Sequence, residues 1–139
     1  MGTEFSVLAS GLVRTLIINP DEHQATHYKL VQKAFDVLIS SFEVGVPINT
    51  IYDKTLAVFK EEKDEAWMTE HMPDNFGHGI GFIHQENHLE ISATNTTKVA
   101  RGHVFYLKIA LSLTRNDEKP YAICIADTMV VRDSVDVVT

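Results

Sequence analysis

The hydrophobic pattern of this chain changes at Pro73. Before Pro73, apolar residues recur at intervals of three or four positions, which predicts amphipathic helices. We expect one helix over residues 20–42 and a second that begins at Ile48 and closes in the charged stretch 61–70. Asn19 is expected to cap the first helix, because proline at the first helical position and acidic residues in the first turn suit a helix N-terminus.

After Pro73 the sequence is punctuated by glycine and rich in β-branched and aromatic residues, which is typical of strands. The expected strands cover residues 76–84, 89–92, 104–113 and 121–131, with a turn at 115–118, and one further strand at 6–18 precedes the first helix. This order of elements predicts an α+β fold, in which two main helices pack on one face of an antiparallel-rich sheet.

Length and composition favour a single domain. A chain of 139 residues with 45% hydrophobic residues can bury a core of its own, and no internal repeat or linker divides it. Residues 1–5 are set apart as a cloning scar, because Gly-Thr and Glu-Phe are what two common restriction sites encode. Residues 6–139 are then expected to be a partial domain of a longer protein.

The charge balance limits the partners. The chain has 12 Lys and Arg against 19 Asp and Glu, and this net charge of -7 opposes binding to nucleic acid or to an anionic membrane surface. No apolar segment approaches the ~18 residues that are needed to cross a bilayer. We therefore expect basic partners, without direct binding to nucleic acid or membrane.

Seven histidines raise the question of a metal site, but their spacing does not support one. His84 and His88 fit the helical zinc signature H-E-x-x-H poorly, because the glutamate between them stands one position late and the surroundings predict a strand or turn. His23 and His27 lie four apart on a predicted helix, but without a third ligand we expect a solvated helix face. The single cysteine, Cys124, lies in an apolar run, where a buried, reduced thiol is expected.

Sequence motifs for cofactors and nucleophiles are absent as well. The chain contains no P-loop, no dinucleotide fingerprint and no Gly-x-Ser-x-Gly nucleophile elbow. The glycine cluster at 77–81 precedes a predicted strand rather than a helix, so it does not predict a phosphate cradle. No cofactor is expected.

Four short segments, in this order along the chain, resemble the pita-bread enzymes methionine aminopeptidase, prolidase and creatinase. They are Ala-Ser-Gly-Leu-Val-Arg-Thr at 9–15, Gly-His-Gly-Ile-Gly at 77–81, Gly-His-Val-Phe-Tyr-Leu-Lys at 102–108 and Ala-Asp-Thr-Met-Val-Val at 126–131. Each is short, but together they cover the chain from about Leu8 to its carboxyl terminus. The resemblance implies a fragment of the pita-bread (creatinase/aminopeptidase) fold.

The same resemblance implies that the metal site of these enzymes is lost. The metallopeptidases hold two divalent ions with two aspartates, one histidine and two glutamates, because paired dications need several anionic oxygens. The second aspartate matches Gly11, and the two glutamates match Lys108 and Ala126. Only His78 keeps its ligand type, and the first aspartate would lie upstream. An ammonium ~4 Å from a dication would cost roughly 8 kcal/mol at an effective dielectric of ~20, so no metal is expected.

The resemblance also implies that no catalytic residue remains. The catalytic histidine of these enzymes follows the metal histidine by seven positions, where this chain has Gln85. His84 is one residue short, which on a strand is a change of face. We therefore expect a vestigial enzyme pocket, able to hold a peptide but without catalysis, at Gly11, His78, Gln85, Lys108 and Ala126.

Among non-catalytic proteins of this fold, the large subunits of FACT histone chaperones have the strongest resemblance. The shared phrases are Arg-Thr-Leu-Ile-Ile-Asn-Pro at 14–20, Leu-Glu-Ile-Ser-Ala-Thr-Asn at 89–95, and Tyr-Ala at 121–122 with Ala-Asp-Thr at 126–128. This resemblance implies a protein of the nucleus and chromosome that binds histones and, through the full-length protein, the small FACT subunit. Other chromatin or replication proteins are further implied partners, in transcription, replication and repair.

Two alternatives stay open. One is an active or divergent metallo-aminopeptidase or proline peptidase with an unorthodox site. The other is a different inactive aminopeptidase homologue that acts as a protein-interaction scaffold. In addition, the strand expected at 6–18 would lack its upstream neighbours, and because exposed strand edges pair, a homodimer through this edge is expected.

Overall fold

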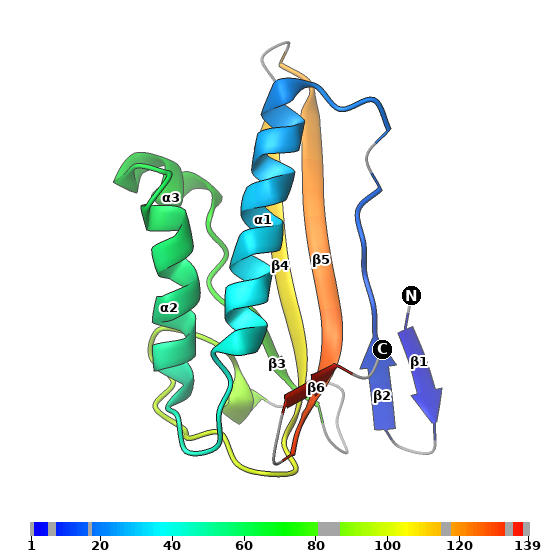
Figure 1. Cartoon of the computed structure of the whole chain (residues 1–139), viewed down its shortest axis with the longest axis vertical. Coiled ribbons are helices and arrows are strands. Elements are labelled where there is room, and N and C mark those ends of the chain that lie inside the picture. The colour runs from blue at the N-terminus through cyan, green and yellow to red at the C-terminus, as the bar shows by residue number, and fades with distance from the viewer. Residues whose placement is uncertain are drawn as a thin grey trace.

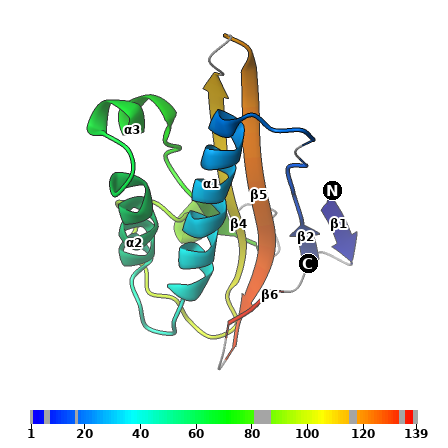
Figure 2. The same cartoon turned by 45° about the horizontal axis from the view of Figure 1, so that its top comes forward.

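The computed structural model describes residues 2–5, 8–16, 18–80, 87–114, 118–132 and 135–137. Helices lie on one face of an antiparallel sheet, and the longest helix runs alongside the two longest strands (Figures 1 and 2). This arrangement confirms the α+β fold expected from the sequence. No helix in the described part of the chain combines the length and apolar character that crossing a bilayer demands.

Helix α1 (Glu22–Ser40) begins later than predicted. The carboxylate of Asp21 accepts a hydrogen bond from the N–H of Gln24 at 2.8 Å, and the Gln24 side chain accepts one from the N–H of Asp21 at 3.2 Å. This reciprocal capping box satisfies the first donors of the helix. The prediction that Asn19 is the cap is therefore wrong.

Helix α2 (Ile48–Lys60) begins where predicted, but the charged stretch after it forms a separate helix, α3 (Glu65–His71). The carboxylate of Asp64 accepts a hydrogen bond from the N–H of Trp67 at 2.8 Å and so caps α3. The expectation that only the tail of one helix lies here is wrong, because the capping residue Asp64 starts a new one. No residue of α3 is fully buried.

The main sheet has the strand order β3-β4-β5-β6, and every neighbouring pair is antiparallel. Its centre is the long hairpin of β4 (Val104–Thr114) and β5 (Pro120–Val131), which confirms two predicted strands. The predicted turn between them lies mostly outside the described residues. The short strand β6 (Val135–Val137) was not predicted.

The strands predicted between Pro73 and β4 are shorter than expected. Of the strand predicted at 76–84, β3 (Gly77–Gly79) is seen, and residues 81–86 lie outside the described part. The strand predicted at 89–92 is wrong: Asn87–Leu89 is a 3-10 turn, and a single bridge, between Asn75 and Ser92, follows. The alternation of apolar residues there reflects burial against the end of β3 rather than a strand of its own.

A hairpin of β1 (Gly2–Phe5) and β2 (Leu8–Gly11) precedes the helices. The strand predicted at 6–18 is therefore shorter, and residues 2–5, which were set apart from the fold, pair with it; their origin in cloning stays a prediction. After β2 the chain runs beside β5 before it crosses to α1 (Figure 1). There the N–H of Val13 donates to the carbonyl of Ala126 at 3.0 Å, and the reverse bond is 2.9 Å.

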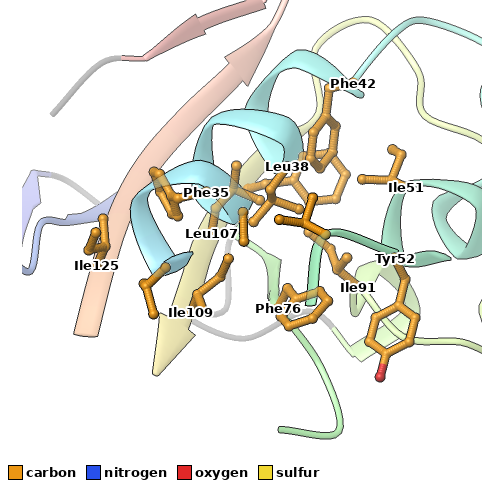
Figure 3. Close-up of a cluster of buried hydrophobic side chains, with 14 of the residues drawn as sticks. Phe35, Leu38, Phe42, Ile51, Tyr52, Phe76, Ile91, Leu107, Ile109 and Ile125 are labelled. Atoms are coloured by element: carbon orange, nitrogen blue, oxygen red, sulfur yellow. The ribbon is translucent and has the colours of Figure 1, made fainter. Parts of the chain in front are cut away.

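The core lies between the helices and one face of the sheet. Every second residue of β4 is buried, and Figure 3 shows Leu107 and Ile109 of β4 packed beneath Phe35 and Leu38 of α1. Each fully buried side chain of this size contributes about 1.5 to 3 kcal/mol through the hydrophobic effect. Because side chains alternate along a strand, the intervening residues of β4 and β5 point to the opposite face.

Candidate functional site

The face of the sheet that points away from the helices carries the candidate site, and we call it the helix-free face. The even-numbered residues of β4 and β5 lie on it, because their odd-numbered neighbours lie on the helix side. Strand register places Lys108 opposite Ala126, and Tyr106 opposite Thr128 on one side and His78 on the other. Cys124 lies on the same face, two residues before Ala126.

Gly11 joins this face from the end of β2. The N–H of Gly11 donates to Oγ1 of Thr128 at 2.7 Å, and the Thr128 hydroxyl donates to the carbonyl of Gly11 at 3.0 Å. The structure thus brings together Gly11, His78, Lys108 and Ala126, four of the positions predicted for the vestigial pocket. The fifth, Gln85, and its neighbour His84 lie outside the described residues. That these positions correspond to former ligands stays a prediction.

The ring of Tyr106 occupies the space that a side chain at position 11 would need. A Cβ atom added to Gly11 would lie 2.7 Å from Cε2 of Tyr106, well inside the optimal separation of nonbonded carbon atoms. The same ring packs against His78, with the ring centroids 5.5 Å apart. Tyr106 was not predicted to belong to this site, because no spacing along the chain indicates that β4 brings this ring to the end of β2.

His78 is the one residue of this set that keeps a potential metal-binding side chain. Its Nδ1 lies 3.0 Å from the carbonyl oxygen of Gly79. A carbonyl can only accept, so Nδ1 carries the proton in the neutral ring and Nε2 carries the lone pair. A single imidazole nitrogen does not make a divalent metal site, which needs three or four ligands. The ring is half-buried beside Tyr106.

Two further groups on this face are held in their neutral forms. Burial raises the pKa of Tyr106, and the proximity of Cys124 raises it further. Burial also raises the pKa of the Cys124 thiol, and the ammonium of Lys108 offsets this effect only in part. Cys124 is half-buried rather than buried as expected, yet its thiol is free and not activated as a nucleophile.

The helix-free face does not fit a divalent metal centre. Gly11 and Ala126 offer no ligand atom, and Lys108 brings a positive charge. Within the described ranges, no group of three or more His, Cys, Asp or Glu residues is close enough to hold a metal ion. Since paired dications need several anionic oxygens, the donor set lacks the required chemistry.

The carboxylate of Asp127, the residue after Ala126, makes its hydrogen bonds on the helix side of the sheet. Asp127 is 4% exposed, and both of its oxygens accept hydrogen bonds from Nη2 of Arg14 at 2.8 Å. The second guanidinium nitrogen, Nη1, donates to the carbonyls of Val13 at 2.9 Å and Ala126 at 2.8 Å. Arg14 therefore fastens the chain after β2 to β5, and Asp127 cannot replace a ligand at position 126 because adjacent residues face opposite ways.

The prediction that His23 and His27 lie on a solvated face of α1 is wrong. His27 is 4% exposed, and its Nδ1 donates to the carbonyl of His23 at 2.7 Å. Nδ1 of His23 in turn lies at hydrogen-bond distance, 2.8 Å, from the hydroxyl of Tyr121. The predicted helical spacing was right, but β5 and α3 cover this face of α1, so His27 is buried and His23 is half-buried.

Close packing between Gly11 and Tyr106 can be tested by a double-mutant cycle. Gly11→Asp should lower the free energy of unfolding by about 1 to 3 kcal/mol, because a side chain must force the Tyr106 ring aside. Tyr106→Ala makes room, so the double variant should lose at least about 1 kcal/mol less than the sum of the two single variants in urea unfolding. Tyr121→Ala serves as the control, since Tyr121 does not contact Gly11, and its effect should add to that of Gly11→Asp. If the losses in free energy of unfolding for Gly11→Asp and Tyr106→Ala add as fully as those for Gly11→Asp and Tyr121→Ala, the packing of Tyr106 over Gly11 is contradicted.

Comparison with known proteins supports the same fold. The model of metallopeptidase family M24 matches residues 1–133. FACT complex subunit SPT16 of Dictyostelium discoideum is 27% identical over 99% of this chain, which spans 14% of that protein's length. FACT complex subunit SPT16 of Zea mays is 25% identical over 96% of this chain and 13% of its own length.

Solved structures show the likeness in three dimensions. The N-terminal domain of FACT complex subunit SPT16 from Cicer arietinum superposes with a TM-score of 0.86 at 27% identity, over 94% of this chain and 32% of that one. Prolidase from Pyrococcus furiosus superposes with a TM-score of 0.83 at 20% identity, over 98% of this chain and 38% of that one, which shows a shared fold. The chain is thus homologous over nearly its whole length to FACT complex subunits named SPT16, and it belongs to metallopeptidase family M24, with the pita-bread fold.

Proposed function

We propose that this chain is a non-catalytic, aminopeptidase-like domain of a FACT-type histone chaperone and that it binds histones. The observation that carries the proposal is the helix-free face, where Gly11, Lys108 and Ala126 bring no carboxylate side chain. The similarity to FACT complex subunits SPT16 supports the chaperone class. Binding, rather than turnover, is then the contribution of this domain to nucleosome reorganisation in transcription, replication and repair.

The acidic surface that suits a basic histone segment lies on the turn after α2 and along α3. Five exposed carboxylate residues occur there within ten positions: Glu61, Glu62, Asp64, Glu65 and Glu70. In a chain with a net charge of -7, this cluster adds local attraction for lysine- and arginine-rich peptides. The interaction is expected to weaken with salt, since exposed charges are screened.

Neutralising this surface tests the histone proposal. Replacing Glu62, Glu65 and Glu70 with Gln should weaken binding of core histones roughly tenfold at low salt, because each removed charge contributes about 0.5 kcal/mol. Fluorescence anisotropy measures this change, in titrations with each of the two core histone pairs and with lysine-rich histone-tail peptides.

The matched control removes the same charge from exposed positions on or beside α1. It combines Glu22→Gln, Asp36→Asn and Glu43→Gln, and it should bind nearly as the unmodified chain does. Equal weakening in both triple variants would show that net charge, rather than the surface along α3, attracts the histone. No binding of any histone at low salt would sink the proposal.

The wider partners follow from the chaperone class. We propose that the full-length protein associates with the small FACT subunit and with other chromatin or replication proteins, in the nucleus and on chromosomes. Direct binding of nucleic acid or membrane by this domain is not proposed, because the net charge of -7 repels phosphate groups. If the domain is instead an inactive aminopeptidase homologue unrelated to chromatin, affinity purification of the full-length protein will recover neither histones nor the small FACT subunit.

The metallopeptidase alternative is favoured by the family and by the likeness to prolidase. The site chemistry opposes it, since a dication finds Lys108 and no set of carboxylates among the described residues of the helix-free face. We expect no hydrolysis of Xaa-Pro dipeptides or of peptides with a free amino terminus after addition of Co²⁺, Mn²⁺ or Zn²⁺. The assay should follow released amino acids, with an active prolidase as the positive control. Metal-dependent turnover by the unmodified chain would show an enzyme with an unorthodox site.

A homodimer through the chain after β2 is the remaining proposal. Residues 13–15 have β5 along one edge, and no described strand covers the other edge. Two large apolar side chains beyond this stretch, Leu16 and Ile18, are 88% and 86% exposed and border a cavity of about 180 Å³ beside Tyr121. Exposed edges with apolar side chains favour pairing with another chain.

Light scattering decides the dimer proposal. The chain should approach the dimer mass as its concentration rises, and Leu16→Lys with Ile18→Lys should keep it monomeric, because two charges on the edge oppose pairing. Val44→Lys is the control: Val44 is 52% exposed and lies away from this edge, so the variant should still dimerise. A monomer at every concentration would remove the proposal.

A further inference from the structure

Helix α3 is attached to the rest of the molecule through a small number of side chains, among them Trp67 and Met68. No residue of α3 is fully buried, and Trp67 is one of its two residues that pack against the hydrophobic core. The indole ring stacks on one ring from α2 and on one from α1: its centroid lies 6.4 Å from that of Phe59 and 5.9 Å from that of His27, both with an interplanar angle of 20°. The position of α3 therefore depends in part on the two rings that stack against this indole.

The partner from α1, His27, is a buried base with an unused nitrogen. Its Nδ1 donates to the carbonyl of His23, so Nε2 carries the lone pair in the neutral ring. Nε2 is buried, and no described residue gives it a hydrogen-bond partner. A proton added there would create a second N–H without an acceptor and a charge removed from water, and both are costly.

The charged groups around His27 also oppose a positive charge on its imidazole ring. They come from each packed element: His23 on α1, His71 on α3 and Lys63 between α2 and α3, whose ammonium lies 5.1 Å from the Trp67 ring. Tyr121 of β5 bonds to His23 and provides no charge to His27. The nearby carboxylates are engaged, because Asp64 caps α3, and Glu61 and Glu62 pair with Lys33 at 3.6 Å and 3.9 Å.

We propose that the packing of α3 on α1 is a proton-sensitive contact, which opens when the imidazole of His27 is protonated. In the open state His27 reaches water, while α1, α2 and the sheet keep their own core. The contact is independent of the histone-binding proposal, although α3 carries Glu65 and Glu70, so that opening would also move part of the acidic surface.

The direction of the pH dependence follows from burial. Desolvation lowers the pKa of His27; the bond to the carbonyl of His23 raises it, and Lys63, His23 and His71 lower it further, with a net lowering from the usual value of 6.5. The closed state thus binds fewer protons than the open one. The closed state has its full stability above about pH 6.5 and loses it progressively as the pH falls below that value. For each unit by which burial lowers the pKa of His27, the equilibrium constant for opening can rise by about tenfold at low pH.

Trp67 is the only tryptophan of the chain, so it reports this contact directly. Between pH 8 and pH 5 we expect its emission to move to longer wavelength, and the amides of α3 to lose protection from hydrogen exchange while those of α1 keep theirs. His27→Phe should retain the stack at pH 8 and abolish the shift, and His27→Gln serves the same purpose if the Phe variant does not fold. His71→Gln is the control, because His71 also contacts Trp67, with ring centroids 4.8 Å apart, and this variant should still show the shift.

Three results would overturn the proposal. The first is an emission spectrum that does not change between pH 8 and pH 5. The second is an identical pH profile for the unmodified chain and the His27 variants. The third is loss of protection in α1 together with α3, since this would show acid unfolding of the whole molecule rather than opening of one contact.

Discussion

The register between β4 and β5 is the constraint on which the rest of the structure depends. The two strands pair continuously from Val104 opposite Val130 to Thr114 opposite Pro120. Because side chains alternate, this register gives Leu107 and Ile109 to the core and Lys108 to the helix-free face. A slip of one residue would bury the ammonium and expose the apolar side chains. The packing of α1 therefore also determines which residues lie on the candidate site.

The described residues of the helix-free face lack the donor set of a divalent metal centre. Several carboxylates on one small surface repel one another unless dications balance them. Glycine, alanine and lysine at positions 11, 126 and 108 bring no carboxylate to this face. The ring of Tyr106 fills part of the space, and the carboxylate of Asp127 is bound by Arg14 on the opposite side. The described part of this face is a packed surface of strands.

Charge is distributed unevenly over the molecule. The acidic cluster lies on the turn after α2 and along α3, whereas Lys108 brings a positive charge to the helix-free face. The helical side of the molecule thus carries an acidic patch that the neighbourhood of Lys108 does not share.

The sequence by itself determined the fold class, the long β4–β5 hairpin and the starts of α1 and α2 to within a few residues, because hydrophobic periodicity is a local property. It also supplied the residue types at positions 11, 78, 108 and 126, whose chemistry excludes a set of carboxylate ligands. The sequence misplaced the cap of α1 and missed α3, since a capping aspartate is distinguished from other acidic residues only by the bonds it makes. Only the tertiary structure decided that Tyr106 lies over Gly11, that Arg14 binds Asp127 and that His27 is buried beneath Trp67. Each of these contacts joins residues far apart in the chain, and such contacts depend on how the elements pack rather than on any spacing that the sequence displays.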